Sequence, residues 1–501
     1  MLIVDEAHNI TNNDYGLAVK KIAEVSKNLK ILLLTGTPMK NAADDLITLL
    51  DIMNTINDKK HKSNLNEIFI GNNHTLDFSK NGEKILRDNV RGKISYIAGG
   101  DKYLFAIRND LGIIPDSLKF TKIIPIKFNK EQYKFYANVV DKNTNGLEKS
   151  SSDVCNFIFP KLIYNDEPEI ELTFGREGLE EIVSQLMTNT NDFNKALTKY
   201  ITDHGYNVSD KNLIYLNNKT LTGSFLHNKY LKLFSPKFHQ VLNNIQNLVE
   251  GKKGPRTAFI YSNLVLIGIN MFKQVLLQNG FIEFNETKDR TINSANDDTV
   301  CYYCGVCKKD HKEIKTHVYY PASFIVITGD QDNDEDMENN EQKKIIDEIF
   351  SSNENRDGKY IKLILGSRVI AEGYNIRNLT EVHILDVYYN FARVDQAVGR
   401  AIRKNSHRFL YSEKNPYPVV DVYKYCMVNN DKPTIEELLY QKAEKKHAMI
   451  KYVEHIIKQE AIDKYLNYEW NNKPINKCIP LEHGNKYDSQ IIKDKELVCK
   501  A

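Results

Sequence analysis

The sequence is poor in three things: net charge, paired cysteines and long apolar runs. Its 68 Lys and Arg residues almost balance its 66 Asp and Glu residues, so any nucleic-acid surface must be a local patch and not a global field. The seven cysteines form no disulfide-like pattern, which favours a reducing, intracellular setting. No apolar run approaches the length of a membrane span, and the printed chain opens on an apolar strand rather than a signal peptide. We therefore expect no membrane partner.

What the sequence does have is an alternation of short apolar strands with helical patterns. At 501 residues, two or three domains are expected. One strand–helix–strand–helix series runs over residues 2–54, and a longer series begins near residue 235. Strands alternating with helices predict an α/β fold with parallel, doubly wound sheets. The expected divisions are the remainder of a first lobe with a helical insertion (1–140), a linker and insertion region (141–234), a second lobe (235–430) with a Cys-rich insertion (285–320), and a C-terminal helix and tail (431–501).

The opening segment MLIVDEAHNI combines an apolar strand with two carboxylates at its carboxyl end. Parallel α/β sheets keep their ligand sites at this edge. Asp5 and Glu6 are therefore candidates to hold Mg²⁺ and to position a water beside a nucleotide's γ-phosphate. On four letters alone, a plain junction between a strand and a helix explains DEAH equally well, so the context decides. That context is a second strand ending in LLLTGTP one helix later, as expected of a neighbour in the same sheet.

Two further motifs follow in the second series. The segment LILGSRVIAEGYNI closes one strand, and DQAVGRAIR has the form Q-x-x-G-R-x-x-R. Its Gln396, Arg400 and Arg403 are spaced i, i+4 and i+7, which predicts one shared helical face. Gly399 inside a helix costs about 1 kcal/mol against Ala, so we expect a packing or close-approach reason for it. Such arginines stabilise the charge that develops in phosphoryl transfer; the alternative is a solvated charged stripe.

With four motifs in this order, the chain resembles the superfamily 2 helicases and translocases. DEAH matches their motif II, TGTP motif III, AEGYN motif V and QAVGRAIR motif VI. FNKEQYKFY and FSPKFHQVL resemble segments of the Swi/Snf-like translocases. CNFIFP, GSRVIAEGYNI, EVHILDVYYNFARVDQAVGRAIR and TIEELLYQKAEKK resemble one viral branch, which holds the poxvirus early transcription factor small subunit, nucleoside triphosphatase I and giant-virus relatives. The resemblance extends from residue 1 to about 465 and implies two RecA-like lobes with parallel sheets.

The resemblance also implies a role for each motif residue. Asp5 would bind Mg²⁺ and Glu6 would act as general base, while Arg400 and Arg403 would reach the γ-phosphate across the cleft between the lobes. Further positions for ATP and Mg²⁺ binding and coupling are Ala7, His8, Gly373, Gln396 and Gly399. Positions that would couple the nucleotide site to nucleic acid are Thr35, Gly36, Thr37, Ser367, Glu372 and Asn375.

The implied function is a nucleic-acid-dependent ATPase motor of viral transcription type, which uses ATP and Mg²⁺ to close its lobes and to move. DNA is a more expected track than RNA, and translocation is more expected than strand separation. Implied partners are a viral RNA polymerase or a large transcription-factor subunit, in the host cytoplasm at the viral factory and in the virion. The alternative is a non-catalytic DNA- or polymerase-binding subunit derived from such a motor. The intact carboxylates and arginines of the motifs favour the motor.

One element of the family pattern is missing from the sequence. No G-K-[ST] phosphate loop occurs among the 501 residues, and GKKGPRT at 251–257 has the wrong order and precedes a strand. Without this loop, the β- and γ-phosphates lose their backbone N–H donors and a lysine. We therefore expect this chain to be the downstream, N-terminally incomplete part of a motor. On that reading it is inactive alone, and an upstream partner fragment carries the loop.

A cysteine-rich segment, CYYCGVCKKDHKEIKTH, interrupts the second series. It offers Cys301, Cys304 and Cys307, with His311 as the expected fourth ligand and His317 as its substitute. C-x2-C pairs present two thiolates from one turn, and a nearby His can complete a tetrahedral Zn²⁺ site. The alternative is a loop with free thiols in a reducing compartment. A structural Zn²⁺ would staple a polar insertion that is too short for a core of its own.

Overall fold

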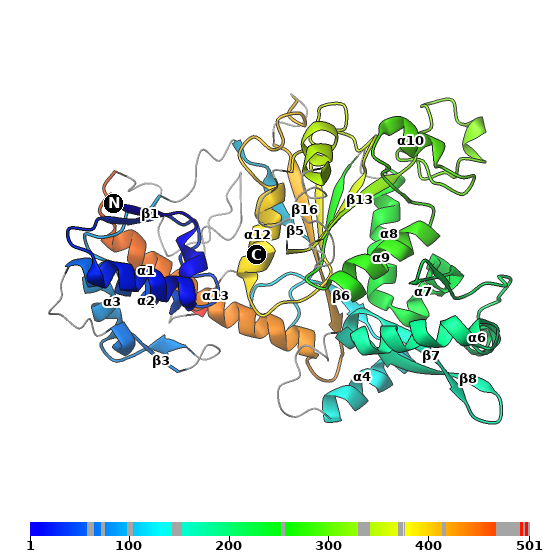
Figure 1. Cartoon of the computed structure of the whole chain (residues 1–501), viewed down its shortest axis with the longest axis horizontal. Coiled ribbons are helices and arrows are strands. Elements are labelled where there is room, and N and C mark those ends of the chain that lie inside the picture. Colours follow the sequence, from blue (N-terminus) through cyan, green and yellow to red (C-terminus); the bar gives the residue numbers. More distant parts are fainter. Residues whose placement is uncertain are drawn as a thin grey trace.

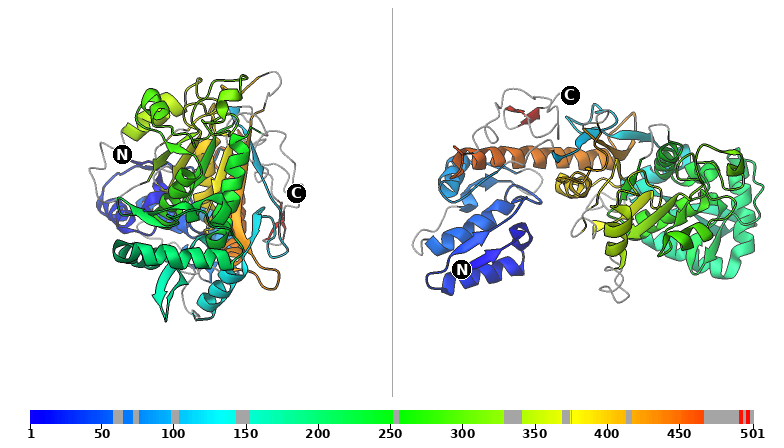
Figure 2. Two further views of the ribbon diagram at one scale, coloured as in Figure 1. Left: turned by 90° about the vertical axis from the view of Figure 1, so that its right-hand side faces the viewer. Right: turned by 90° about the horizontal axis from the view of Figure 1, so that it is seen from above.

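The computed structural model has a small N-terminal unit and a larger α/β unit (Figure 1). A long helix, α13 (Ile435–Glu460), extends from the larger unit along the smaller one (Figure 2). Within the part of the chain described, no helix combines the length and the apolar character needed to span a bilayer. The structure describes residues 1–57, 65–71, 76–97, 104–142, 153–251, 256–328, 341–368, 374, 376–412, 417–466, 491–493 and 496–498.

The N-terminal unit contains the first strand–helix–strand–helix series, as the sequence predicts. Its strands β1 (Leu2–Val4) and β2 (Ile31–Leu33) pair in parallel, with Ile3 opposite Leu32. Both strands are apolar throughout, which is typical of strands buried on both faces. The other elements of this unit are η1 (Ala7–Ile10), α1 (Asp14–Val25), α2 (Asp45–Asn57), η2 (Leu65–Glu67), β3 (Phe69–Ile70), β4 (Asp77–Phe78) and α3 (Gly82–Val90).

The core of the N-terminal unit includes one face of α13. Leu50 and Val90 are buried in one cluster with Val453 and Ile457 of that helix. The end of α13 is tied to α3 as well, because Glu460 accepts hydrogen bonds from Arg87 and Arg91 at 3.1 and 2.9 Å. This unit therefore depends for its core on a segment more than three hundred residues away along the chain.

The larger unit is built on a parallel sheet with the strand order β12-β13-β14-β11-β15-β16-β5, and β6 also pairs with β16. Alternate side chains of β11 face two cores. Ala258 and Ile260 pack with α8 and α9, whereas Phe259 and Tyr261 pack with α12. This is the doubly wound arrangement that the sequence predicts. The strands are β5 (Ile107–Asp110), β6 (Ile124–Lys127), β11 (Ala258–Tyr261), β12 (Ile282–Glu283), β13 (Ser323–Ile327), β14 (Leu363–Gly366), β15 (Glu381–Ile384) and β16 (Val419–Val428).

Two strands lie in a different sheet from the one expected. β5 and β6 pair in parallel with β16, so they belong to the larger unit, although the sequence predicted a first lobe reaching residue 140. A strand's apolar pattern does not reveal its partner, and here the partner lies about three hundred residues downstream. The helices of the larger unit are α4 (Lys130–Lys142), α7 (Asn228–Phe234), α8 (Pro236–Val249), η5 (Val265–Asn270), α9 (Met271–Gln278), α10 (Lys288–Asn293), η6 (His311–Glu313), η7 (Ile346–Phe350) and α12 (Phe391–Ala401).

The region from residue 153 to 234 is folded onto the larger unit. Phe157 contacts Phe225 and Phe238, so this region shares its core with α8. It is therefore an integral part of the larger unit, where the sequence predicted a linker with insertions. Its remaining elements are the hairpins β7 (Ile158–Tyr164) with β8 (Pro168–Phe174) and β9 (Tyr215–Asn217) with β10 (Thr220–Thr222), the helix α6 (Gly175–Asp203) and η4 (Ser224–Leu226). A separate hairpin, β17 (Ile491–Lys493) with β18 (Glu496–Val498), follows near the chain end.

Four sequence motifs meet in one buried polar network at the start of α8. Lys237 Nζ lies 2.5 Å from Glu436 Oε1 and 2.8 Å from Asn156 Oδ1, and both Lys237 and Glu436 are fully buried. Asn156 in turn donates to Asp386 at 2.8 Å. These residues come from CNFIFP, FSPKFHQVL, EVHILDVYYN and TIEELL. The network thus fixes α8, β15 and α13 against one another.

Candidate nucleotide site

The carboxylates of DEAH lie exposed at the carboxyl end of β1. Glu6 adopts a left-handed backbone conformation, with φ of 48°, and its N–H donates to Asp5 Oδ1 at 2.9 Å. For a residue other than Gly or Asn this conformation costs on the order of 1–2 kcal/mol. Such strain concentrates at functional sites because the fold there holds a side chain in a required direction. Here the left-handed conformation of Glu6 turns the chain so that two adjacent carboxylates project from the end of the strand.

His8 connects the DEAH segment to the TGTP segment. Its Nδ1 lies 2.9 Å from Thr35 Oγ1, 3.3 Å from Thr37 Oγ1 and 3.3 Å from a carboxylate oxygen of Glu6. Thr35 Oγ1 also accepts the N–H of Thr37 at 3.1 Å. Ala7 is buried beneath, and its N–H donates to the carbonyl of Leu34. The two motifs are therefore in direct contact, as expected for neighbouring strands.

Gly36 lies between Thr35 and Thr37 and is exposed, and a Cβ at this position would meet nothing within 4 Å.

Only the start of motif V, in the larger unit, lies within the described residues. Ser367 is buried at the end of β14, and its N–H donates to the carbonyl of Ile327 at 3.1 Å. Glu372, Gly373 and Asn375 lie outside the described residues.

Motif VI occupies α12, which begins at Phe391 after the N-cap Asn390. Gln396 and Arg400 share this helix and are half-buried. The helix ends at Ala401, so Arg403 lies beyond it; the sequence predicted all three side chains on one helical face. A Cβ on the exposed Gly399 would meet nothing within 4 Å, so the packing reason that we expected for this glycine is absent among the described residues.

A tight turn holds Arg403 after the helix. The Arg403 N–H donates to Ser406 Oγ at 3.1 Å, and the Ser406 N–H returns a hydrogen bond to the Arg403 carbonyl at 3.0 Å. Ser406 Oγ also contacts Nδ1 of His407 at 2.9 Å, and Nε2 of His407 contacts the Leu379 carbonyl at 2.5 Å. A buried histidine thus supports the turn that positions an exposed arginine.

We expect His407 to make the folded chain less stable in mild acid. Burial lowers the pKa of His407 to about 4, whereas an unfolded chain has a His pKa of about 6.5. Between these values the unfolded state binds a proton that the folded state does not. The contribution of the neutral His407 to the free energy of unfolding is therefore complete above about pH 6.5. It is lost as the pH falls towards about 4, and the total loss is up to roughly 3 kcal/mol.

The measurement is the free energy of unfolding by urea at about pH 7 and about pH 5, for the natural chain and for His407→Gln. Gln keeps a donor for the Leu379 carbonyl but does not titrate. We expect a smaller drop on acidification in the variant. Equal drops in the two proteins would contradict the assignment, because other histidines are common to both.

The two units touch at the start of motif VI. The Asn390 amide donates to the carbonyl of Lys40, and it lies 3.4 Å from Asn41 Oδ1. Nearby, the ammonium of Lys446 on α13 sits over the Tyr389 ring at 4.5 Å. The loop that follows TGTP therefore contacts the N-cap of the helix that carries Arg400. No sequence pattern pointed to Asn390, because an N-cap asparagine is explained locally.

Lys40 and Asn390, the two residues of this contact, each lie in a region that matches a known protein family. An SNF2-related domain matches residues 1–168, and a helicase conserved C-terminal domain matches residues 286–405. Over these residues the chain carries an SNF2-related domain and a helicase C-terminal domain, which is consistent with a Swi/Snf-like protein of superfamily 2. The α/β fold with a large parallel sheet agrees with this family.

Viral proteins are among the relatives of this Swi/Snf-like chain. A putative ATP-dependent RNA helicase of Acanthamoeba polyphaga mimivirus is 41% identical over 95% of this chain and 42% of its own length. An early transcription factor large subunit homologue of African swine fever virus is 21% identical over 96% of this chain and 41% of its own length. The chain thus spans about two fifths of the length of these relatives. The relatives are viral, as the sequence predicted, although the African swine fever virus protein is a homologue of the large subunit of the early transcription factor and not of the small subunit.

Among solved structures, the C-terminal part of the Fun30 ATPase domain covers 71% of this chain and 98% of its own, with 13% identity and a TM-score of 0.33. The fold assignment rests on the strand order described above and not on this likeness.

The helicase C-terminal match of this Swi/Snf-like chain includes the cysteine-rich insertion. One ligand atom from each of Cys301, Cys304, His311 and His317 lies within 4.8 Å of the other three. Cys307 is not in this group. The sequence predicted three cysteines with one histidine, whereas the structure brings together two of each.

Proposed function

We propose that this chain is the downstream part of a nucleic-acid-dependent ATPase motor. The observation that carries the proposal is the contact between the Asn390 N-cap and the loop at Lys40 and Asn41, because it joins motif III to motif VI across the two units. A motor of this family needs such a connection, since ATP binding must change how the lobes sit on each other.

The exposed carboxylates of Asp5 and Glu6 fit a magnesium nucleotide. Both supply hard oxygen ligands and both are exposed, and Glu6 also lies 3.3 Å from His8 Nδ1. When bound, Mg²⁺ would neutralise charge on the phosphate oxygens. Asp5 would hold the ion, and Glu6 would accept the proton of the attacking water. His8 would keep Glu6 oriented and pass changes at the nucleotide to Thr35 and Thr37.

Arg400 and Arg403 would stabilise the γ-phosphate charge from the opposite unit. Arg403 is exposed and held by the Ser406 turn, while Arg400 projects from α12 with Gln396 beside it on the helix. Gly399 leaves open space next to Arg400, which would let a phosphate or a nucleic-acid backbone approach closely. In motif V, Ser367, Glu372 and Asn375 would couple the nucleotide site to nucleic acid, and Gly373 would take part in binding ATP and Mg²⁺.

We further propose that a segment carrying the phosphate loop completes the first unit. Ile3 and Leu32 sit opposite each other in the two-stranded sheet and are 56% and 43% exposed. On α1, the apolar side chains of Leu17 and Val25 are each 67% exposed. A two-stranded sheet with a bare apolar face is poorly stable alone, and parallel strands are normally covered on both faces. Further strands and a helix would cover this surface, and the greater length of the relatives supports such a segment.

The test is ATP hydrolysis by this chain alone, and by the chain mixed with a polypeptide that contains the phosphate loop, taken from the coding sequence directly upstream. We expect turnover only in the mixture, stimulated by duplex DNA. RNA is the comparison arm, because one relative is named an RNA helicase. Turnover by the chain alone would overturn the need for the loop segment. Absence of turnover in both, with DNA still bound, would favour a non-catalytic DNA- or polymerase-binding subunit.

A variant of the bare sheet tests the docking surface itself. Leu32→Asp places a charge on the exposed face, so we expect the mixture to lose most of its turnover and the two polypeptides to separate on gel filtration. The matched control is Leu466→Asp, because Leu466 is 88% exposed shortly after the end of α13. Equal assembly of both variants would contradict docking on this sheet.

The setting we propose is viral transcription, because relatives carry early transcription factor names. The partners would be a viral RNA polymerase or a large transcription-factor subunit, met in the host cytoplasm at the viral factory and in the virion.

A further inference from the structure

We propose that Cys301, Cys304, His311 and His317 form a structural Zn²⁺ site in the insertion between β12 and β13. This Cys2His2 set is separate from the nucleotide site, and its metal would have no part in hydrolysis.

The spacing of the ligand atoms is close to that of a tetrahedral site. With zinc–ligand distances of about 2.0–2.3 Å, the edges of the tetrahedron are about 3.3–3.8 Å. Cys301 Sγ lies 3.3 Å from His317 Nε2, and His311 Nε2 lies 3.0 Å from His317 Nε2. All four atoms lie within 4.8 Å of one another, so shifts of less than about 1 Å would complete the tetrahedron.

The burial of the ligands also favours a metal. Cys301 is fully buried and His311 is only 5% exposed, and their ligand atoms lie within 4.8 Å of each other. Two imidazole nitrogens at 3.0 Å must share a proton or a cation, because two bare lone pairs repel. A soft-to-borderline cation satisfies sulfur and nitrogen ligands together, and two thiolates with two neutral imidazoles balance the charge of Zn²⁺.

The backbone around the first two cysteines is a tight turn of the kind that presents paired sulfurs. The Gly305 N–H donates to the Cys301 carbonyl at 3.0 Å, and the Cys301 N–H donates to the Val306 carbonyl at 2.9 Å. Gly305 has φ of +71°, a conformation that L side chains rarely adopt.

Cys307 has a different part in this fold. Its carbonyl accepts the N–H groups of Asp310 and His311 at 3.0 and 2.9 Å, so its backbone builds the turn that delivers His311. Its residue also forms a β-bridge with Val300. The backbone of the third cysteine therefore positions a ligand, while its sulfur stays outside the cluster.

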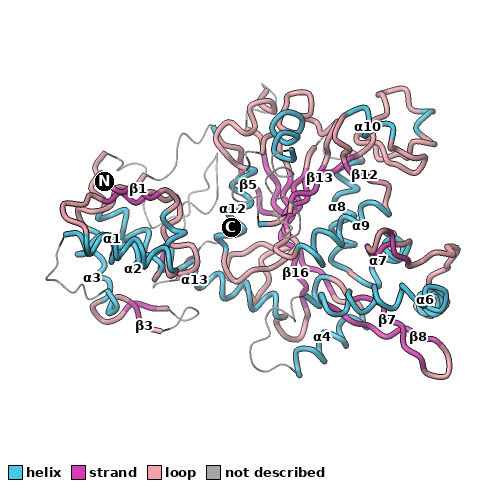
Figure 3. Tube along the Cα trace, in the orientation of Figure 1, coloured by secondary structure: helices cyan, strands magenta, loops and turns pink. Residues whose placement is uncertain are grey.

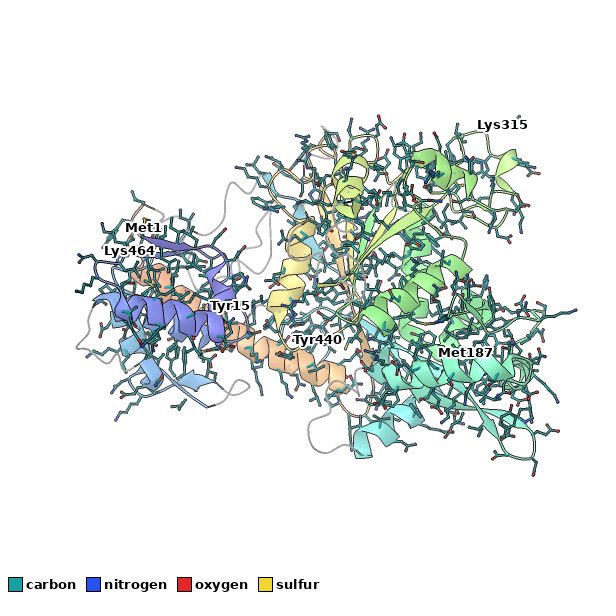
Figure 4. All side chains as sticks on the ribbon, in the orientation of Figure 1. Met1, Tyr15, Met187, Lys315, Tyr440 and Lys464 are labelled. Atoms are coloured by element: carbon teal, nitrogen blue, oxygen red, sulfur yellow. The ribbon has the colours of Figure 1, made fainter. Side chains whose placement is uncertain are left out.

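The insertion needs such a staple because it contains little regular structure. Apart from α10 and one short turn it is drawn as loop, and Lys315 marks its outer tip (Figures 3 and 4). Its attachment to the larger unit is aromatic: Tyr320 contacts Tyr360 with ring centroids 5.3 Å apart, and Tyr302 packs over Lys362. Zinc would close the loop from Cys301 to His317 over this attachment and fix its outer part.

The experiment measures metal content of the full chain by mass spectrometry and then titrates metal-free protein with Co²⁺. We expect about one zinc ion per chain and, with cobalt, the visible absorption of a tetrahedral site with thiolate ligands. Cys304→Ser and His317→Ala should each lower zinc retention at least about tenfold. Cys307→Ser is the matched control and should keep the natural zinc content.

Two results would overturn the proposal. One is a chain that retains no zinc and gives no tetrahedral cobalt spectrum. The other is loss of zinc in Cys307→Ser with retention in His317→Ala, which would indicate a three-cysteine set instead. If a variant does not fold, proteolysis of the natural chain with and without metal still tests the site. Chelation should expose residues 285–320 to a protease, and Zn²⁺ but not Mg²⁺ should restore protection; an unchanged cleavage pattern would also overturn the site. None of these readouts depends on ATP turnover.

Discussion

Arg403→Ala is expected to lower ATP turnover of the completed motor by about a thousandfold or more. An arginine that contacts the γ-phosphate in the transition state contributes roughly 10³–10⁵ in kcat in comparable phosphoryl transfers. Arg403 is exposed just after α12 and is held by its own turn, so truncating the side chain removes the guanidinium with little effect on the core. The loss should appear in kcat more than in KM, because the charge that the arginine meets develops during the reaction.

Lys404→Ala provides the control for this prediction. Lys404 is the next residue and is also exposed, so it shares the local backbone and charge but lies outside the Q-x-x-G-R-x-x-R pattern. We expect it to keep turnover within about threefold and to weaken DNA binding at most modestly. If both variants lost turnover equally, the effect would be one of net charge on this surface, and a specific role for Arg403 would be excluded.

Glu436→Ala is expected to destabilise the folded chain by about 3–5 kcal/mol. Removing one partner of a buried ion pair leaves an uncompensated charge, and here the ammonium of Lys237 would remain fully buried. The same carboxylate accepts the N–H of Met427 at 2.7 Å, so a backbone donor would lose its partner as well. Urea unfolding of the natural chain and the variant, followed by circular dichroism, measures the difference.

The double variant Lys237→Met, Glu436→Leu separates burial of charge from loss of packing. It removes both charges and keeps similar volumes, so most of the stability should return. Glu180→Gln is a surface control, since its pair with Arg176 is exposed and should contribute nothing measurable. A double variant as unstable as the single one would show that the hydrogen bonds to Asn156 and Met427, not the buried charge, carry the effect.

The sequence predicted local elements well and long-range partners poorly. Apolar strands before DEAH and TGTP, and the strand–helix alternation of the larger unit, follow from periodicity, which each segment carries by itself. Periodicity contains no information about which sheet a strand joins, and β6 pairs with β16 from the other end of the chain. For the same reason periodicity did not reveal that α13 packs on both units: Leu439 and Tyr440 lie with Cys426 of β16, whereas Val453 and Ile457 lie in the core of the first unit.

The candidate sites show the same division. The order of the motifs predicted that the strands before DEAH and TGTP are neighbours, and they pair as expected; His8 then lies beside Thr35 because adjacent strands bring their ends together. Spacing alone suggested that Arg403 continues the helix and that Cys307 joins the metal cluster, but helix ends and turn geometry decide both. The contact of Asn390 with Lys40 could not be predicted from the sequence, because the role of Asn390 as an N-cap already explains an asparagine at this position.

The entry of α13 into the N-terminal core also constrains how the chain is made. Ribosomes add about 5–20 residues per second, so Leu50 and Val90 emerge roughly 20–80 seconds before Val453 and Ile457, their partners in the folded core. During that interval the first unit has no complete interior of its own, and its apolar strands remain available to other chains. The N-terminal unit therefore stays incomplete until α13 has been synthesised, and early binding of a chaperone or of a companion polypeptide would protect its apolar strands during that interval.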